Sequence, residues 1–179
     1  MANNAGILID DELNEKSCAL YVTQARDVLA QGADRVRFDI ASWGGDIAVT
    51  RIMHEVLVNE KICYDTRAIF TSSAASYFFL TGERREVLES AAIRFHGVGF
   101  LVMLSDVDNE GVIDQERLQS WRELVDWCRE ILMAKTALDR VTIERILASR
   151  SNLEFDARQA VKAGLVDEIV TTQRSAARD

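Results

Sequence analysis

Short apolar or alternating segments, typical of strands, recur along the first half of the chain with helical patterns between them. The strand-like segments are residues 6–9, 35–41, 61–70, 86–88 and 92–95. Helical spacing of apolar residues occurs over 11–30 and 47–58, and Gly32 follows the first of these as a helix stop. Because strands and helices alternate, we expect an α/β fold in which parallel strands are joined by right-handed crossovers.

The pattern changes after residue 96. Residues 97–105 are extended and apolar, residues 106–111 form a polar turn, and a long helix is predicted from about 114 to 136. At about 1.5 Å per residue this helix would exceed ~30 Å, which is long for a compact domain of this size. Its wide apolar face, with two tryptophans, favours burial against another subunit, and internal packing is the alternative.

The last part of the chain completes a single predicted domain. We expect a helix at 141–149, a polar loop at 150–152, a helix at 157–163 and a closing strand within 164–170. Residues 171–179 are polar and are expected to fray. No repeat or linker divides the sequence.

Composition narrows the function classes. The chain has 179 residues, 48% of them hydrophobic, and a net charge of −8, which argues against a nucleic-acid-binding surface. No apolar run is long enough for a membrane span, and the N-terminus does not resemble a secretory signal. Cys18, Cys63 and Cys128 fit reduced thiols in a cytoplasmic protein. No pattern indicates a metal site or a cofactor.

Two segments indicate nucleophilic chemistry. Ser76 belongs to a run of small and hydroxyl residues, 71–76, directly before an apolar helix, and His96 ends a predicted strand. A hydroxyl nucleophile beside an imidazole is the minimum for acyl transfer. A tight packing turn is the plainer interpretation of the serine segment, because other hydroxyls lie beside Ser76. The second histidine, His54, lies inside a helix and is expected to be structural or on the surface.

A Gly-Gly turn supplies a third element. Gly44 and Gly45 follow a predicted strand, and glycine leaves a backbone N–H unhindered toward a substrate carbonyl. A phosphate loop is disfavoured because no Gly-Lys-Ser/Thr sequence follows. In parallel sheets, ligands bind outside the carboxyl ends of the strands. The Gly-Gly turn and the serine segment are therefore expected on the same rim.

Taken together and in order, these segments resemble the ClpP family, the proteolytic subunits of the Clp protease. The matching residues are Phe38-Asp-Ile-Ala-Ser-Trp-Gly-Gly-Asp46, Ala74-Ala-Ser-Tyr77, Ile93-Arg-Phe-His96, and Ala157 to Val170 with its Gly164-Leu-Val-Asp-Glu-Ile169 signature. The match runs over residues 6–170.

The resemblance implies a ClpP/crotonase-like fold, a repeated β-β-α superhelix with a projecting handle helix. The head would comprise about 6–96 and 150–170, the handle about 97–149 and the tail 171–179 of one domain. It also implies a serine endopeptidase that hydrolyses peptides or proteins inside heptameric, stacked rings. Ser76 would be the nucleophile and His96 the general base, with an oxyanion hole formed by the N–H groups of Gly45 and Tyr77.

The third member of the implied triad departs from the family. Motif register places Asn152 where the family has an aspartate, and Asp156 is the alternative if the local loop is two residues longer. An asparagine can orient an imidazole, but it cannot neutralise an imidazolium. In serine proteases of the trypsin type, aspartate-to-asparagine exchange lowers the rate about 10⁴-fold. We therefore expect reduced activity.

Two other functions stay open. The chain begins at the first predicted strand, so the family's axial loops have no counterpart and coupling to an AAA+ unfoldase is in doubt. Together with Asn152, this makes a catalytically inactive, structural or regulatory ClpP-like subunit the main alternative. A crotonase-type acyl-CoA enzyme is the third candidate, because Gly44-Gly-Asp46 also resembles that family's turn.

Overall fold

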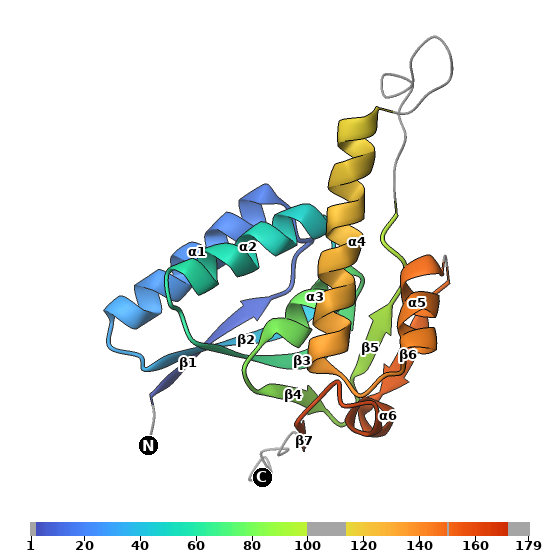
Figure 1. Ribbon diagram of the computed structural model, residues 1–179. Helices are drawn as coiled ribbons and strands as arrows, with labels where there is room; N and C mark the ends of the chain where they lie inside the picture. The colour runs from blue at the N-terminus through green and yellow to red at the C-terminus, as the bar shows by residue number, and fades with distance from the viewer. Residues whose placement is uncertain (1–2, 100–113, 150, 172–179) are drawn as a thin grey trace.

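A mostly parallel sheet forms the centre of the molecule in a computed structural model, which describes residues 3–99, 114–149 and 151–171 (Figure 1). Within the described residues the strands are β1 (Asn4–Ile9), β2 (Arg35–Ser42), β3 (Tyr64–Ser72), β4 (Arg85–Leu88), β5 (Ala92–Phe95), β6 (Leu153–Asp156) and β7 (Glu168–Val170). Neighbouring strands follow the order β1-β2-β3-β4-β7, all parallel. The end of β3 also pairs with β5, and β6 runs antiparallel to β5.

Helices connect these strands. They are α1 (Glu15–Ala30), α2 (Ile47–Asn59), α3 (Ala74–Thr81), α4 (Gln115–Lys135), α5 (Arg140–Ala148) and α6 (Ala157–Lys162). The connections from β1 to β2, from β2 to β3 and from β3 to β4 each contain one helix, as the alternation of sequence patterns predicts. The expected α/β class is therefore confirmed.

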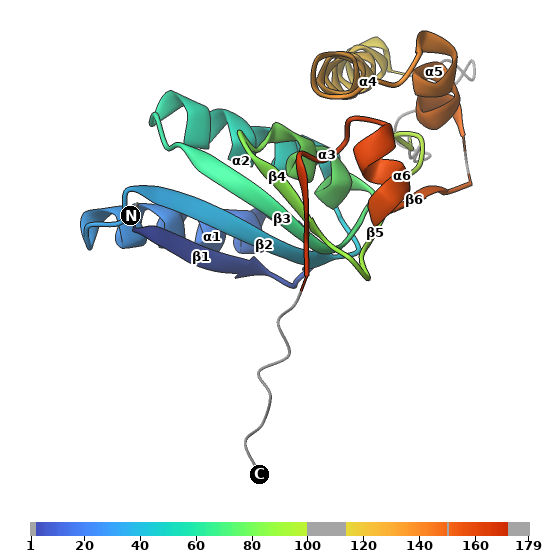
Figure 2. The ribbon, with the colours of Figure 1, turned by 90° about the horizontal axis from the view of Figure 1, so that it is seen from below.

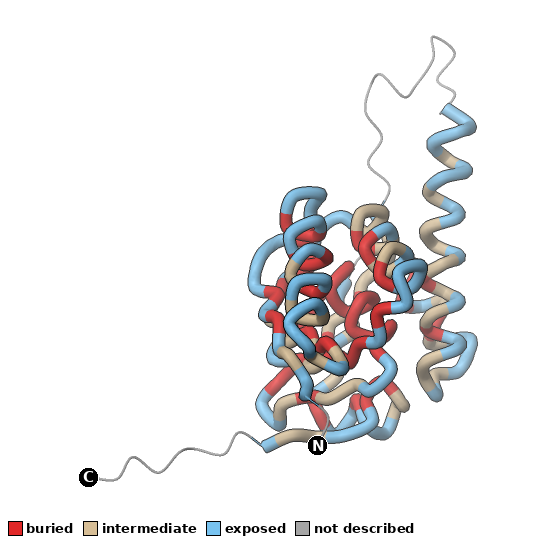
Figure 3. Tube along the Cα trace, turned by 90° about the vertical axis from the view of Figure 1, so that its left-hand side faces the viewer, coloured by how far each residue is buried: buried red, intermediate tan, exposed pale blue. Residues whose placement is uncertain are grey.

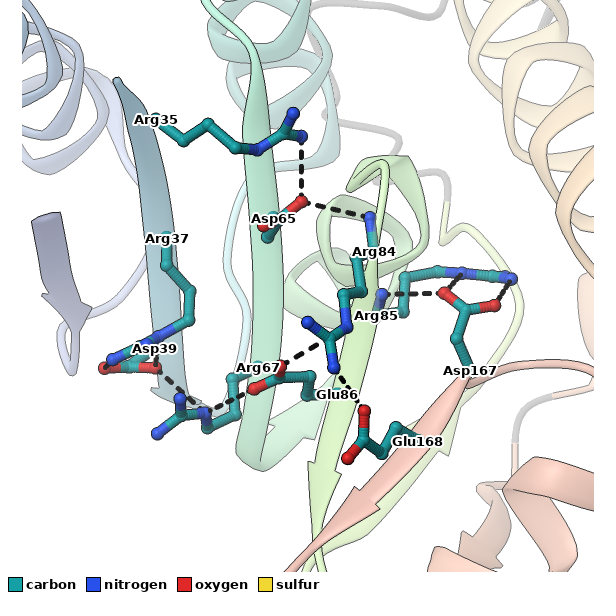
Figure 4. Close-up of polar contacts among 10 residues, drawn as sticks. All are labelled: Arg35, Arg37, Asp39, Asp65, Arg67, Arg84, Arg85, Glu86, Asp167 and Glu168. Atoms are coloured by element: carbon teal, nitrogen blue, oxygen red, sulfur yellow. Dashed lines mark hydrogen bonds and ion pairs between the residues drawn. The ribbon is translucent and has the colours of Figure 1, made fainter. Parts of the chain in front are cut away.

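The two faces of the sheet have different chemistry because side chains alternate along each strand. In β2, Val36, Phe38 and Ile40 are fully buried, whereas Arg37 and Asp39 are half-buried on the opposite face. Charged side chains of β2, β3, β4 and β7 form ion pairs across that second face (Figure 4). The core consequently lies on the face against which the helices pack.

The long helix predicted at 114–136 is confirmed as α4. One end of α4 rises beyond the other described elements in Figure 1, and Figure 2 views the helix nearly end-on, beside α5. Among its residues only Cys128 and Leu132 are buried, and most of its length is exposed or half-buried (Figure 3). Its expected burial against another subunit stays a prediction.

The sequence analysis missed one strand, β6. Residues 153–156 alternate only briefly, and their strand conformation comes from pairing with β5, from Phe95 opposite Leu153 to Ala92 opposite Asp156. The predicted turn at 106–111 and most of the extended segment at 97–105 lie outside the described residues. No helix in the described part of the chain is long and apolar enough to span a membrane.

Candidate active site

Three segments from the ends of β2, β3 and β5 line one cleft, which we call the serine–histidine cleft. Gly45 follows β2, Ser73 follows β3, and His96 follows β5. The start of α2 and the side chains of Trp121 and Leu124 from α4 complete its wall, and its volume is about 390 Å³. The predicted common rim of the Gly-Gly turn and the serine segment is therefore present.

Ser73 occupies the turn between β3 and α3. Its backbone has φ 55° and ψ −129°, a left-handed conformation that is costly for any residue other than glycine. Its N–H donates to the Arg94 carbonyl (3.1 Å), which ties the turn to β5. Ser73 is half-buried and lines the cleft, whereas every residue of α3 is buried. A strained serine between a strand and a helix, exposed to a cleft, has the backbone setting of a nucleophile elbow, although the surrounding sequence lacks that motif.

Ser76, the expected nucleophile, does not line this cleft. It is fully buried, and its hydroxyl donates to the Arg94 carbonyl (2.8 Å) and lies 3.0 Å from the Thr71 hydroxyl. The Ser76 hydroxyl therefore binds to residues of β3 and β5. This position fits the plainer interpretation of the segment, in which Ser76 is a packing residue. The sequence analysis noted the hydroxyls beside Ser76 but did not single out Ser73, the serine that lines the cleft.

His96 is held by hydrogen bonds on both its ring and its backbone. Its Nδ1 lies 2.8 Å from the Gly97 carbonyl, so Nδ1 carries a proton and donates it. The remaining ring nitrogen, Nε2, is then the acceptor in the neutral imidazole. The hydroxyl of buried Tyr77 donates to the His96 carbonyl (3.3 Å), and burial raises the pKa of this phenol. Gly97 N–H donates to Ser149 O (2.8 Å), which anchors the next residue.

Backbone amides at the cleft are available to a developing anion. Gly45 pairs with Leu13 in a parallel β-bridge, in which the Leu13 N–H donates to the Gly44 carbonyl and the Asp46 N–H donates to the Leu13 carbonyl. The bridge does not use the Gly45 N–H, which points away from Leu13. Ala74 is the first residue of α3, where the backbone N–H has no intrahelical partner. Tyr77, the expected second donor, also lines the cleft, and the Ser73 carbonyl one turn before it accepts from the Ser76 N–H (3.0 Å). The Ala74 N–H is thus a further candidate donor at the cleft, and the role expected for Tyr77 stays a prediction.

The two candidates for a third member differ in their relation to His96. Asn152 directly precedes Leu153, which pairs with Phe95, the residue before His96, and Asn152 is exposed. Asp156 lies opposite Ala92, four residues away along the strand. Its carboxylate caps α6 by accepting from the Gln159 N–H (2.8 Å). Register thus favours Asn152 as the neighbour of His96.

The remaining candidate residues have structural surroundings. His54 Nδ1 lies 2.7 Å from the Tyr64 hydroxyl, as expected for a structural histidine. Burial raises the pKa of Cys18 to about 11 and of Cys128 to about 12, so both thiols stay protonated. Among the described residues, no group of three or more His, Cys, Asp and Glu side chains is arranged to hold a metal ion.

Comparisons with known proteins add no family assignment to this geometry. The sequence matches no protein-family model, and a search of curated proteins also gives no match.

Proposed function

We propose that this protein is a ClpP-like serine endopeptidase subunit in which Ser73, in place of Ser76, is the nucleophile and His96 is the general base. The observation that carries this proposal is the cleft that Ser73 and His96 line together with Gly45. The order of the motifs that resemble the ClpP family supports the peptidase reaction over other acyl transfers. No cofactor takes part in the proposed chemistry.

The proposed reaction uses each of these groups in turn. The Ser73 hydroxyl attacks the scissile carbonyl carbon while His96 Nε2 accepts the hydroxyl proton. The N–H groups of Gly45 and Ala74 stabilise the negative charge on the carbonyl oxygen, assisted by the positive end of the α3 dipole. His96 then gives the proton to the leaving amine. Water, deprotonated by the same nitrogen, releases the acid from Ser73.

The groups around the His96 imidazole favour a low rate of catalysis. Its Nδ1–H donates to the neutral Gly97 carbonyl, and the candidate third member that directly precedes β6 is the neutral Asn152. Both can fix the tautomer, but neither supplies a negative charge to the imidazolium that forms during attack. We therefore propose a reduced activity compared with that of a complete Ser-His-Asp triad.

The assembly is proposed on the same basis. The projecting end of α4 supports the handle role that the resemblance implies, with heptameric rings stacked face to face around peptide or protein substrates. Sedimentation of the purified protein measures this directly. A mass of seven or fourteen chains supports the proposal, and a monomer at micromolar concentration contradicts it. An AAA+ unfoldase is the kind of partner that the resemblance implies for the delivery of substrates.

A fluorophosphonate probe tests the catalytic proposal, because it modifies only an activated serine. We expect labelling of the wild-type protein, loss of labelling in Ser73→Ala and His96→Ala, and retained labelling in Ser76→Ala. Ser76→Ala is the matched control, since it removes the same hydroxyl three residues away. Peptide mapping of the labelled protein then identifies which serine carries the probe.

Each other outcome contradicts part of the proposal. Loss of labelling in Ser76→Ala alone would return the nucleophile to Ser76. A folded oligomer that no probe labels would favour an inactive structural or regulatory subunit. Tight binding of an acyl-CoA thioester without labelling would favour the crotonase-type reaction.

A further inference from the structure

A second cavity lies between α4 and α5, next to the serine–histidine cleft. It has a volume of about 640 Å³, and its walls include Val125 and Arg129 of α4 and Glu144 and Leu147 of α5. Both cavities are lined by Trp121 and by the extended segment 96–99 that begins with the proposed base. Trp121 and this segment are therefore the shared wall of the two spaces.

A hydrogen bond fixes the position of Trp121 in this wall. The indole Nε1–H donates to the Val98 carbonyl (3.0 Å), and the side chain is half-buried. An indole has one polar donor, so this bond sets the orientation of the ring. Because Val98 is two residues from His96, the indole is attached to the same segment that carries the proposed base.

The residues that line the second cavity favour the binding of an uncharged group. Val125 and Leu147 give it apolar walls, and its charged residues already have partners. Arg129 Nε donates to Glu144 (2.9 Å), and Arg129 also pairs with Asp126. An acidic side chain entering the cavity would have to compete with these carboxylates for Arg129. An apolar group would not disturb the ion pairs.

We propose that Trp121 is the specificity-determining residue of the serine–histidine cleft and limits the size of the substrate side chain next to the scissile bond. With the indole in place, the cleft accepts small and medium apolar side chains. The second cavity is an adjacent space that becomes continuous with the cleft, and so available to large aromatic side chains, when the indole is removed. This inference rests on the proposed peptidase function.

The test compares peptide substrates with alanine, leucine or naphthylalanine at the residue before the scissile bond. We expect Trp121→Ala to raise the naphthylalanine-to-alanine ratio of kcat/KM at least about tenfold, in the range that pocket size commonly produces. Trp121→Phe keeps an aromatic wall and should change the ratio little. Leu118→Ala is the matched control, because Leu118 is half-buried on the same helix and lines neither cavity.

A ligand-binding measurement separates this inference from the proposed function. In a Ser73→Ala background, naphthalene should bind to Trp121→Ala and not to Trp121→Phe, as measured by calorimetry. If a small phosphonate labels Ser73 but the ratio of kcat/KM does not change in folded Trp121→Ala, Trp121 does not set specificity. If no phosphonate labels Ser73, the proposed function fails, and naphthalene binding still decides whether Trp121 closes the second cavity. Trp121→Leu replaces Trp121→Ala if the alanine variant does not fold.

Discussion

At Gly44, the Gly-Gly turn approaches the turn that carries Ser73. The φ of Gly44 is +101°, and a Cβ at this position would lie 2.6 Å from the Ser72 carbonyl oxygen and 2.7 Å from the Ser73 Cβ. A side chain here would therefore push against the turn that carries the proposed nucleophile. Only glycine allows the two turns to approach this closely.

The first prediction is that Gly44→Ala destabilises the protein much more than Gly32→Ala does. Gly32 has a similar φ of +94°, but a Cβ there would meet nothing within 4 Å. Gly32→Ala should cost only the left-handed strain of about 1–2 kcal/mol, and Gly44→Ala should cost at least ~2 kcal/mol more because of overpacking. Urea unfolding of both variants measures the difference. Equal losses of stability in the two variants would show that the Ser73 turn moves away from the added Cβ at no cost in free energy.

The second prediction concerns Asn152, which directly precedes Leu153, the β6 residue that pairs with the neighbour of His96. Asn152→Asp should raise kcat/KM for a peptide substrate at least about tenfold, because a carboxylate stabilises the imidazolium formed during attack. Asp156→Asn is the control. It should leave kcat/KM unchanged and weaken only the α6 cap, by up to about 1 kcal/mol. An unchanged rate in Asn152→Asp would indicate that His96 works with the Gly97 carbonyl alone.

The serine segment shows the limit of sequence reasoning at this scale. The pattern of small and hydroxyl residues correctly indicated a strand-to-helix turn, but Ser73 and Ser76 are equivalent by residue type and close in sequence. The backbone at the start of α3 decides which hydroxyl faces the cleft, since φ 55° at Ser73 turns the chain there. The sequence could not indicate this, because a left-handed serine is enforced by its surroundings.

At the scale of elements, His54 joins α2 to two neighbours. Its ring bonds to the Tyr64 hydroxyl of β3 (2.7 Å) and lies 6.3 Å from the Trp127 ring of α4, measured between centroids. Burial lowers the pKa of His54 from its ordinary value of 6.5, partly opposed by the charge of Glu55 and assisted by that of Lys135. The folded protein therefore favours the neutral ring.

The third prediction is a loss of stability in mild acid that depends on His54. Because its pKa is lower in the folded state, the unfolded chain binds more protons as the pH falls below about 6.5, the unperturbed value. The free energy of unfolding should be fully retained above that pH. It should decrease by up to about 1.4 kcal/mol per pH unit between 6.5 and the lower folded pKa. Urea unfolding at pH 7.5 and 5.5 should show a larger decrease in wild type than in His54→Gln, and equal decreases would contradict the assignment.

Most elements follow from local patterns, with ends displaced by a few residues. The predicted strand at 61–70 is found at Tyr64–Ser72, and the long helix expected at 114–136 is found at Gln115–Lys135. The missed strand β6 has only four residues. Its conformation depends on β5, which is about sixty residues away in sequence, and no local periodicity reports such a pairing.

At the scale of the whole molecule, a chain of ion pairs crosses the second face of the sheet (Figure 4). Glu86 is central, since it contacts Arg67 of β3 (3.0 Å) and Arg84 (3.6 Å), and its side chain is only 13% exposed. Arg84 in turn pairs with Glu168 of β7, so Glu86 connects three strands from distant parts of the sequence. The sequence analysis did not anticipate this network.

The fourth prediction follows from the burial of Glu86. Glu86→Gln should lower the free energy of unfolding by about 1–3 kcal/mol, because two guanidinium groups lose a largely buried carboxylate partner. Glu83→Gln removes a carboxylate that pairs with Arg35 but is 56% exposed, and it should cost less than about 0.5 kcal/mol. Thermal and urea unfolding measure both variants. A loss in Glu86→Gln no larger than that in Glu83→Gln would mean that the network does not stabilise the sheet.

The sequence by itself determined the α/β class, most of the helices and strands, and the common rim of the Gly-Gly turn and the serine segment. These features depend on local periodicity and on the general behaviour of parallel sheets. Only the tertiary structure decided which serine lines the cleft with His96, that Asp156 pairs with Ala92 at the far end of β5 from His96, and that Trp121 lines two adjacent cavities. Each of these depends on backbone conformation and on contacts between residues far apart in sequence, which residue types alone do not specify.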